Sequence, residues 1–387
     1  MLRRLLGAFR GKPRSSGPGF LAYIGDVDAP LRVGAAPPLY AAQASVRLRT
    51  LIPAQRIARS LPVWILPPAA AMRPGGLEAL GTALAVVIVK VPAARLAAEW
   101  PAFEPLLRWI ESKSRAQPLV ADLSDDYQAY GALEAGAPGA AAHPAAWQAS
   151  LARHCHLTVP CEALRQALAP RAARGISVIE DPYESPRARP WRAPRAAPLR
   201  LCWFGNIGAS TLPVLEEALH AVAARFCGAA IVAEIVAAAQ RKPLILDMAR
   251  RLGARHPGLA IGFTEWSPRA TWEALERCDF VLLPQEAGQA WGRVKSHNRL
   301  VEALRAGRFA LGAPIPSYLE LAEFAWIGEE PAAGIEWALA HPREAGERVA
   351  RGQAYVEGRF APEVVTAKWR QALGLGAAQS VRSSAAT

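Results

Sequence analysis

Charged residues that could bind a phosphorylated ligand gather in residues 295–307, whose sequence is KSHNRLVEALRAG. Ser296 is a residue type that caps helix N-termini, so we expect a helix to begin there. If the helical turn extends back to Lys295, the spacing places Lys295, Arg299 and Glu302 on one helix face. Two cations and one carboxylate would then meet at the start of a helix.

This pattern has two interpretations. A Lys and an Arg can neutralise a diphosphate, helix N–H groups add further donors, and a Glu can accept the two hydroxyl groups of a ribose. In the other interpretation these residues form a solvated helix face, on which an Arg299–Glu302 ion pair contributes only about 0.2–0.5 kcal/mol. Spacing alone does not choose between a nucleoside diphosphate site and an ordinary helix surface.

A glycine-containing segment, residues 203–210 (WFGNIGAS), follows an apolar strand and precedes a helix. Gly205 and Gly208 would let the backbone approach a phosphate, and the next helix would offer its N-terminal N–H groups. The spacing G-x-x-G differs from the dinucleotide fingerprint G-x-G-x-x-G. Gly205 and Asn206 are candidate ligand-binding residues, and a simple strand-to-helix turn is the alternative.

Carboxylates follow another expected strand, at residues 119–123. Asp122, Asp125 and Asp126 come at its end, where a carboxylate could orient or deprotonate an acceptor hydroxyl group. Asp122 and Asp125 are therefore catalytic candidates, together with Lys295. In the alternative interpretation the aspartates cap helices and form turns.

No metal site is predicted. Asp26 and Asp28 form a D-x-D pair, but they follow the first expected strand, where aspartate commonly forms a turn. The sequence His-Cys-His at residues 154–156 alternates as in a strand, and its distance from Cys161 does not match a zinc finger. We therefore expect neither a metal nor another cofactor.

Two series of apolar strands alternating with helices must position these residues. Residues 83–91 (ALAVVIVKV) are the clearest strand, because continuous β-branched residues suit a parallel strand covered on both faces. In the second half, strands are expected at 199–204, 230–236, 259–263 and 280–283, and a helix at 298–306. The predicted fold class is α/β, with two doubly wound Rossmann-like domains facing each other across a cleft.

Composition sets the expected domain boundaries. Residues 184–198 are rich in proline and arginine and lack apolar periodicity, so we expect an interdomain linker there. The expected parts are a basic flexible N-terminus (1–17), a first Rossmann-like domain (18–183), the linker (184–198), a second Rossmann-like domain with a closing helix at 362–373 (199–376), and a flexible tail (377–387).

Composition also excludes several classes of protein. The chain has 387 residues, 52% of them hydrophobic and 20% charged, which is ordinary for a globular protein. Its five cysteines lack C-x-x-C spacing, which favours buried thiols in a reducing compartment. No apolar run reaches the roughly 20 residues of a membrane-spanning helix. The sequence has no P-loop and no nucleophile elbow, so a P-loop ATPase and a hydrolase of that kind are disfavoured.

The formal charge of +12 favours anionic partners. The sequence has no interleaved basic and aromatic stripe, so we do not expect nucleic acid to be one of them. Basic and apolar residues alternate over residues 1–14, a pattern that could rest on an anionic membrane surface or form a frayed terminus.

Residues 279–307 resemble the donor-binding segment of bacterial glycosyltransferases of the two-Rossmann-domain (GT-B) type. The resemblance is to the subgroup that carries Lys-Ser-x-Asn-Arg before a Glu-Ala-x-x-x-Gly helix. Four other segments fit the same family: SVRLR at 45–49, VADLSDD at 120–126, LTVPC at 157–161 and DPYE at 181–184. The resemblance spans roughly residues 44–324.

The resemblance implies transfer of a glycosyl group from a nucleotide sugar. Glu302 would bind the ribose, and Lys295 and Arg299 the diphosphate. The implied donor-binding set is Gly205, Asn206, Lys295, Ser296, Asn298, Arg299 and Glu302, with Arg47 and Arg49 toward the acceptor or the cleft. Retaining members have a glutamate where this sequence has Val294, and they have an Arg and a Lys that are absent from residues 204–211, so the stereochemical outcome stays open.

The implied partners are a nucleotide-sugar donor and a glycan, lipid-linked or protein acceptor. The expected location is the cytoplasm, with the chain peripheral at the inner face of the membrane. The alternative, suggested by the departures, is a non-catalytic paralogue that binds nucleotide or sugar without turnover. A nicotinamide-dependent oxidoreductase is disfavoured because the dinucleotide fingerprint is absent.

Overall fold

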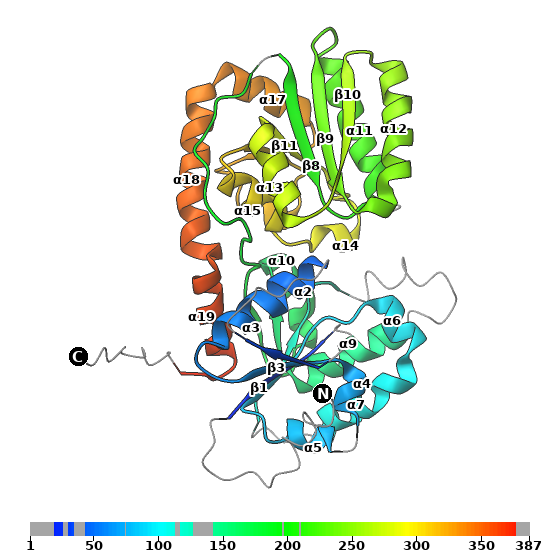
Figure 1. Cartoon of the computed structure of the whole chain (residues 1–387), viewed down its shortest axis with the longest axis vertical. Helices are drawn as coiled ribbons and strands as arrows, with labels where there is room; N and C mark the ends of the chain where they lie inside the picture. Colours follow the sequence, from blue (N-terminus) through cyan, green and yellow to red (C-terminus); the bar gives the residue numbers. More distant parts are fainter. Residues whose placement is uncertain are drawn as a thin grey trace, which may run out of the picture. The chain divides into compact units, whose positions relative to one another are not determined.

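A computed structural model describes residues 19–25, 30–34, 43–73, 75–112, 117–126, 142–195, 197–208 and 210–376. The chain divides into two compact units, Met1–Ile179 with Pro362–Thr387, and Glu180–Ala361. Each unit is a sheet with helices on its two faces (Figure 1). The basic N-terminus, the Asp26/Asp28 pair and the tail after residue 376 lie outside the described residues.

The first unit contains a seven-stranded sheet in the order β2-β3-β1-β4-β5-β6-β7. All neighbouring strands are parallel except β2, which is antiparallel to β3. The strands are β1 Leu21–Ile24, β2 Leu31–Val33, β3 Val63–Leu66, β4 Ala85–Ile88, β5 Leu119–Asp122, β6 His156–Val159 and β7 Ile176–Val178. The helices are α2 Ala44–Val46, the π-helical turn Arg47–Leu51, α3 Ile52–Ile57, α4 Pro68–Ala71, α5 Gly76–Leu80, α6 Ala93–Ala98, α7 Trp100–Ser112, α9 Ala142–His154, α10 Glu162–Leu168 and a 3-10 turn at Ala169–Arg171.

The helix α19 (Pro362–Ala372) completes the core of this unit. Val365, Trp369 and Leu373 recur at intervals of four residues, so they share one helix face. All three are buried with Tyr23 and other residues of the first sheet. One face of α19 is therefore part of the first unit's interior.

The second unit contains a six-stranded parallel sheet in the order β10-β9-β8-β11-β12-β13. Its strands are β8 Leu199–Phe204, β9 Ile231–Ala237, β10 Leu259–Glu265, β11 Phe280–Leu283, β12 Phe309–Gly312 and β13 Trp326–Ile327. Its helices are α11 Thr211–Arg225, a 3-10 turn at Ala239–Arg241, α12 Lys242–Arg255, α13 Pro268–Arg277, α14 Ala290–Arg293, α15 Asn298–Arg305, α16 Pro316–Leu319, α17 Pro331–Ala340 and α18 Pro342–Phe360. Numbered from β8, this is the doubly wound order 3-2-1-4-5-6.

The proline- and arginine-rich segment before β8 runs along the second unit. Arg189 donates to Glu276 of α13, with 2.6 Å between Nε and Oε1, and its backbone N–H donates to the Arg305 carbonyl. Arg192 pairs with the buried Asp279 at 3.0 Å. These contacts fasten the segment to α13, α15 and the start of β11.

The predicted fold class is confirmed, because each unit is a parallel-dominated, doubly wound α/β domain. The strands expected at 199–204 and 280–283 have the bounds that the sequence indicated. β2, β12 and α18 were not predicted from the sequence. Among the described residues, no helix is both long and apolar enough to cross a bilayer.

Candidate functional site

The strand order of the second unit reverses between β8 and β11, and ligands of doubly wound sheets bind outside the carboxyl ends of the strands at that point. Gly205 follows β8 directly. Its φ of 148° is a conformation that essentially only glycine adopts. A Cβ atom there would lie 3.4 Å from both the Arg299 guanidinium and the Trp203 ring. The glycine therefore lets the backbone of the turn after β8 lie close to Arg299 and Trp203.

Arg299 links this turn to α15. Its guanidinium lies 5.6 Å from the centre of the Trp203 ring, and its Nη1 is 3.5 Å from the Phe204 carbonyl oxygen. Trp203 is buried, so the indole fixes the arginine in place. Arg299 has no carboxylate partner among the residues that the structure describes. A half-buried guanidinium without a counter-ion is a receptor for an anion.

Lys295 lies just before α15, and its Nζ atom is 5.3 Å from the centre of the Trp291 ring. The helix begins at Asn298, so Lys295 does not belong to its first turn, contrary to the expectation from spacing. Lys295, Arg299 and Glu302 therefore do not form one continuous helix face. Trp291 was not among the predicted site residues, although an aromatic residue near a cation in the segment after a strand is a recognisable pattern.

Ser296 is not the N-cap of α15, as the sequence had suggested. The residue before the helix is His297, and Ser296 Oγ donates instead to Asp181, with 2.6 Å between Oγ and Oδ2. Asn298 is half-buried, and its Nδ2 is buried without a hydrogen-bond partner in the described part of the chain. Asn206, on the turn after β8, is exposed. Asn298 and Asn206 thus keep donors that a ligand could use.

Glu302 is only 4% exposed, and the backbone N–H of Glu184 donates to its Oε1 at 2.5 Å. Burial raises the pKa of the Glu302 carboxyl from its ordinary 4.5 to about 7, and hydrogen bonds from the Glu184 N–H and from the hydroxyl and N–H groups of Ser185 lower it by less. Binding of a ribose by Glu302 stays a prediction, and it requires residues 184–185 to give way.

Residues 180–185 are held against α15 and α18, and we call them the strap. Arg305 of α15 lies 3.6 Å from the centre of the Tyr183 ring, and its Nη1 is 2.6 Å from Oε2 of Glu357. The Tyr183 hydroxyl donates to the same Glu357 carboxylate at 3.0 Å. Arg305, which follows the Lys-Ser-His-Asn-Arg segment in α15, therefore packs against the strap.

His297, which no sequence motif marked, is 1% exposed and packs against the end of α18. Its Nε2 is 3.1 Å from Oε2 of Glu320, and its ring meets Phe360 edge to face. Arg359 joins Glu320 to Glu180 of the strap, at 3.2 Å and 2.8 Å. Burial would raise the pKa of Glu320, but His297 and Arg359 outweigh it and hold that pKa below its ordinary value.

In the first unit, Asp122 is fully buried and paired with Arg49. Arg49 Nη2 is 2.5 Å and Nε 3.1 Å from the Asp122 carboxylate, and Thr158 Oγ1 donates to it at 2.8 Å. Arg49 also donates to the Ile179 carbonyl and lies 5.4 Å from the centre of the Trp369 ring. The expected catalytic role of Asp122 does not fit these contacts, because both its oxygens are engaged away from solvent.

Asp125 and Asp126 follow β5 and are also mostly buried. Asp125 pairs with Lys90, the residue after the apolar run of β4, and Asp126 accepts from Gln148 at 3.0 Å and Arg171 at 3.1 Å. Sequence reasoning missed Lys90, although a single cation at the end of the most apolar strand marks it. Arg47 is 7% exposed within the π-helical turn. A catalytic role for Asp125 stays a prediction.

Metal ligands do not cluster in the described part of the chain, where no group of three or more His, Cys, Asp or Glu side chains could hold an ion. His156, part of the sequence His-Cys-His, hydrogen-bonds Ser177 at 2.9 Å and lies 3.1 Å from the Arg174 carbonyl oxygen. The histidine therefore joins β6 to β7 and its neighbouring turn.

No protein-family model matches the sequence, and no curated protein matches it. Solved structures do match the fold. Anabaena HepE in complex with UDP superimposes with a TM-score of 0.58 at 13% identity, covering 92% of this chain and 99% of that one. WaaG, a glycosyltransferase involved in lipopolysaccharide biosynthesis, gives 0.55 at 13% identity, covering 92% and 100%. The α,α-trehalose 6-phosphate synthase of Burkholderia multivorans gives 0.60 at 9% identity, covering 93% and 98%. The chain therefore has the GT-B fold of these structures.

Proposed function

We propose that the protein is a glycosyltransferase that moves a sugar from a nucleotide-sugar donor to an acceptor. The observation that carries the proposal is Arg299, held on Trp203 beside the strained Gly205 turn without a carboxylate partner among the described residues. It stands at the point where a sheet of this order binds ligands. The structures of HepE with UDP and with UDP-glucose support the choice of ligand class.

The chemistry follows from charge. A sugar leaves a nucleotide sugar as the bond to the diphosphate breaks, so negative charge grows on the diphosphate oxygens. Arg299 and Lys295 would stabilise that charge, assisted by the free N–H groups at the start of α15 and by the Asn298 amide. We propose that these groups act without a metal ion. The turn at Gly205 and Asn206 would pack against the donor.

The proposed acceptor is a surface glycan, a lipid-linked saccharide or a protein, and the proposed location is the cytoplasmic face of the membrane. Asp125, whose Oδ2 pairs with Lys90, is the carboxylate that we propose to deprotonate or orient the acceptor hydroxyl group, because Asp122 is fully buried with both its oxygens bonded. The proposed subgroup is the one with the Lys-Ser-x-Asn-Arg motif, which this chain matches at residues 295–299.

A binding protein without turnover is the second candidate. Two observations favour it: Asp122 is inaccessible, and Val294, which is 9% exposed, occupies the position of the second glutamate of retaining members. Both candidates predict nucleotide binding. They differ in whether a nucleotide sugar is consumed and its nucleoside diphosphate released in the presence of an acceptor.

The test is calorimetric titration of the purified chain with UDP, GDP, TDP and CMP. We expect one of them to bind, and Arg299→Ala to weaken that binding about 10- to 150-fold, the loss of a charge-assisted hydrogen bond of about 1.5–3 kcal/mol. Lys295→Ala should weaken it in the same way. Arg250→Ala is the matched control, because Arg250 is an exposed arginine on α12 paired with Asp247.

Binding by none of these nucleotides to a folded sample would refute the donor site. Equal binding by wild type and Arg299→Ala would place the nucleotide elsewhere. A nucleotide that binds while no nucleotide sugar is turned over with any of the three acceptor classes would favour the non-catalytic alternative.

A further inference from the structure

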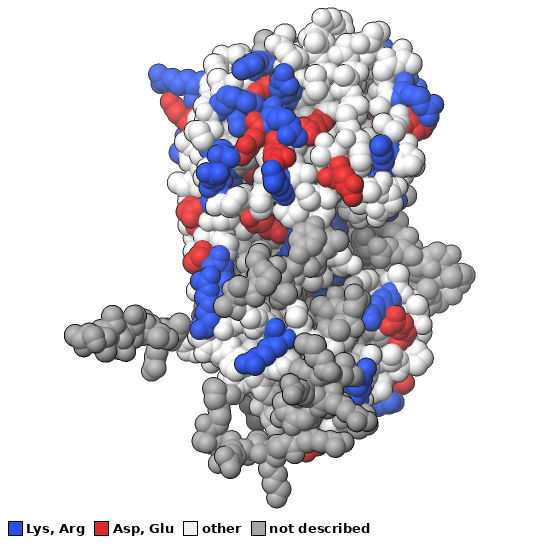
Figure 2. Space-filling model, in the orientation of Figure 1, with Lys and Arg blue, Asp and Glu red and all other residues white. Residues whose placement is uncertain are grey.

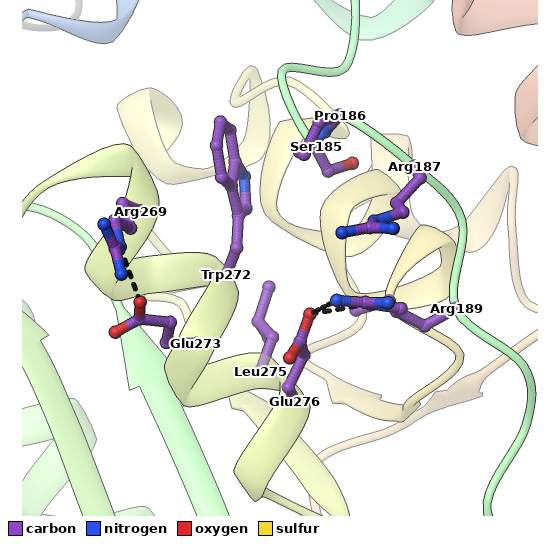
Figure 3. A pocket seen from close by; sticks show the side chains of 10 residues that line it. Ser185, Pro186, Arg187, Arg189, Arg269, Trp272, Glu273, Leu275 and Glu276 are labelled. Carbon is purple, nitrogen blue, oxygen red and sulfur yellow. Dashed lines mark hydrogen bonds and ion pairs between the residues drawn. The ribbon is translucent and has the colours of Figure 1, made fainter.

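A small cavity lies on the second unit away from the Gly205 turn, between α13 and the segment after the strap. Its volume is about 230 Å³, which is smaller than the roughly 300–1,000 Å³ of sites for drug-sized ligands. Ser185 and Arg187 line one side, Trp272 of α13 lines the other, and the buried Leu275 lies between them (Figure 3). We call this the Trp272 pocket. It has room for one ring-sized group.

Most charges around the Trp272 pocket are already paired. Arg269 Nε lies 2.7 Å from Oε1 of Glu273, and Arg189 is paired with Glu276. Arg187 differs, because it makes no hydrogen bond and no ion pair with any residue that the structure describes. Its guanidinium extends into the cavity, across from the Trp272 ring (Figure 3). The uncompensated charge of the pocket is therefore the positive charge of Arg187.

Ser185 is a buried polar residue of the pocket lining and is only 7% exposed. Its hydroxyl group is engaged with the Glu302 carboxylate, where its hydrogen bond lowers the pKa of that carboxyl. The Arg187 guanidinium is therefore the polar group on this side of the pocket that a ligand can use.

The opposite side of the pocket is aromatic. The half-buried Trp272 presents an indole next to Leu275, which gives a flat apolar wall. The Glu273 and Glu276 carboxylates at the edge can accept hydrogen bonds from hydroxyl groups. A pyranose ring combines an apolar C–H face with hydroxyl groups around its edge, and it matches this arrangement of groups.

We propose that the Trp272 pocket binds a carboxylate-bearing sugar residue. The sugar ring would lie on Trp272, and its carboxylate would pair with Arg187. The surface around α13 carries interspersed basic and acidic side chains, which suits a ligand with both hydroxyl and carboxylate groups (Figure 2). This inference rests on the proposed function for the saccharide class, and it makes the pocket a subsite for an acidic glycan.

The experiment is calorimetric titration of the full chain with a hyaluronan tetrasaccharide, which alternates glucuronate and N-acetylglucosamine. Maltotetraose is the neutral probe and inorganic phosphate is the anion-only probe. We expect the hyaluronan fragment to bind, and Arg187→Ala and Trp272→Ala each to weaken binding at least about tenfold, which is about 1.4 kcal/mol. Arg250→Ala, on α12, should bind like the wild type.

The proposal is overturned if the hyaluronan fragment does not bind at about 10 mM, or if maltotetraose binds as tightly as the hyaluronan fragment does. It is also overturned if phosphate displaces the fragment while Trp272→Ala has no effect on its binding. Displacement of the fragment by the nucleotide that binds at Arg299 would overturn it as well. Nucleotide binding is measured on the same samples. If Arg187→Ala and Trp272→Ala keep nucleotide binding but the acidic saccharide never binds, the pocket fails while the donor site stands. If no nucleotide binds and the acidic saccharide does, the donor site fails while the pocket stands.

Discussion

Replacing Glu302 with glutamine should change how the stability of the second unit depends on pH. The wild-type carboxyl is buried, and its pKa rises from 4.5 to about 7 on folding. At 1.36 kcal/mol per pKa unit, this shift corresponds to about 3 kcal/mol. The Glu302→Gln variant would keep an oxygen acceptor for the Glu184 N–H without a charge to bury.

The sign follows from proton binding. Between pH 4.5 and about 7 the folded state binds more protons at Glu302 than the unfolded state does, so stability falls as pH rises through this window. The cost is absent below pH 4.5 and complete above about pH 7. Relative to wild type, the Glu302→Gln variant should therefore gain about 2.5 kcal/mol between pH 5 and pH 8.

The assay is urea unfolding followed by tryptophan fluorescence at pH 5 and pH 8, with each transition fitted separately because the chain has two units. Glu347→Gln is the matched control, since the Glu347 side chain is 54% exposed. A difference between variant and wild type that stays constant from pH 5 to pH 8 would refute the burial argument. An equal change in the Glu347→Gln control would refute it as well.

Three further predictions concern the backbone and core that position the sites. Asp122→Ala should destabilise the first unit by about 3–5 kcal/mol, because it leaves the buried Arg49 charge unpaired, and a loss below about 1 kcal/mol in urea unfolding would contradict that. Gly205→Ala should cost about 1–3 kcal/mol because of its φ of 148°, and a crystal structure of the variant with an unchanged turn would argue against strain. Gly25→Ala should destabilise the first unit by about 1–3 kcal/mol, because its Cβ would lie 2.1 Å from Val89 Cγ2. Thermal unfolding unchanged from wild type would show that the Val89 side chain moves aside without cost.

The strands that hold the candidate site could be predicted because their sequences are continuous apolar runs ended by glycine or proline. β8 ends before Gly205 and β11 ends before Pro284, and both have the predicted bounds. The helix α18 escaped notice for a physical reason. Gly346 and Gly352 pack against Trp191 and Phe324, where a Cβ would lie within 3 Å of the ring or side chain. The buried face of α18 places glycine and alanine between its larger apolar residues, Val349, Val356 and Phe360, so its hydrophobic pattern is sparse.

The site was harder to predict than the fold, because long-range partners decide what each side chain is free to do. Asp122 stands at a strand end, as expected, but Arg49, 73 residues earlier, occupies it. Ser296 has the right residue type for a helix cap, but Asp181, 115 residues earlier, takes its hydroxyl. Residue type and spacing identify chemically able side chains, and only the folded chain shows which of them have been used for packing.

That distinction divides the Lys-Ser-His-Asn-Arg-Leu-Val-Glu segment into two sets of residues. Ser296 and Glu302 bind the strap through Asp181 and the Glu184 N–H, so they fix where α15 begins and how it lies in the second unit. Arg299 faces the Gly205 turn and has no carboxylate partner among the described residues. Because Ser296 and Glu302 anchor α15 through the strap, the segment can hold Arg299 at the end of β8 without neutralising its charge. A cation in that state is what a diphosphate requires.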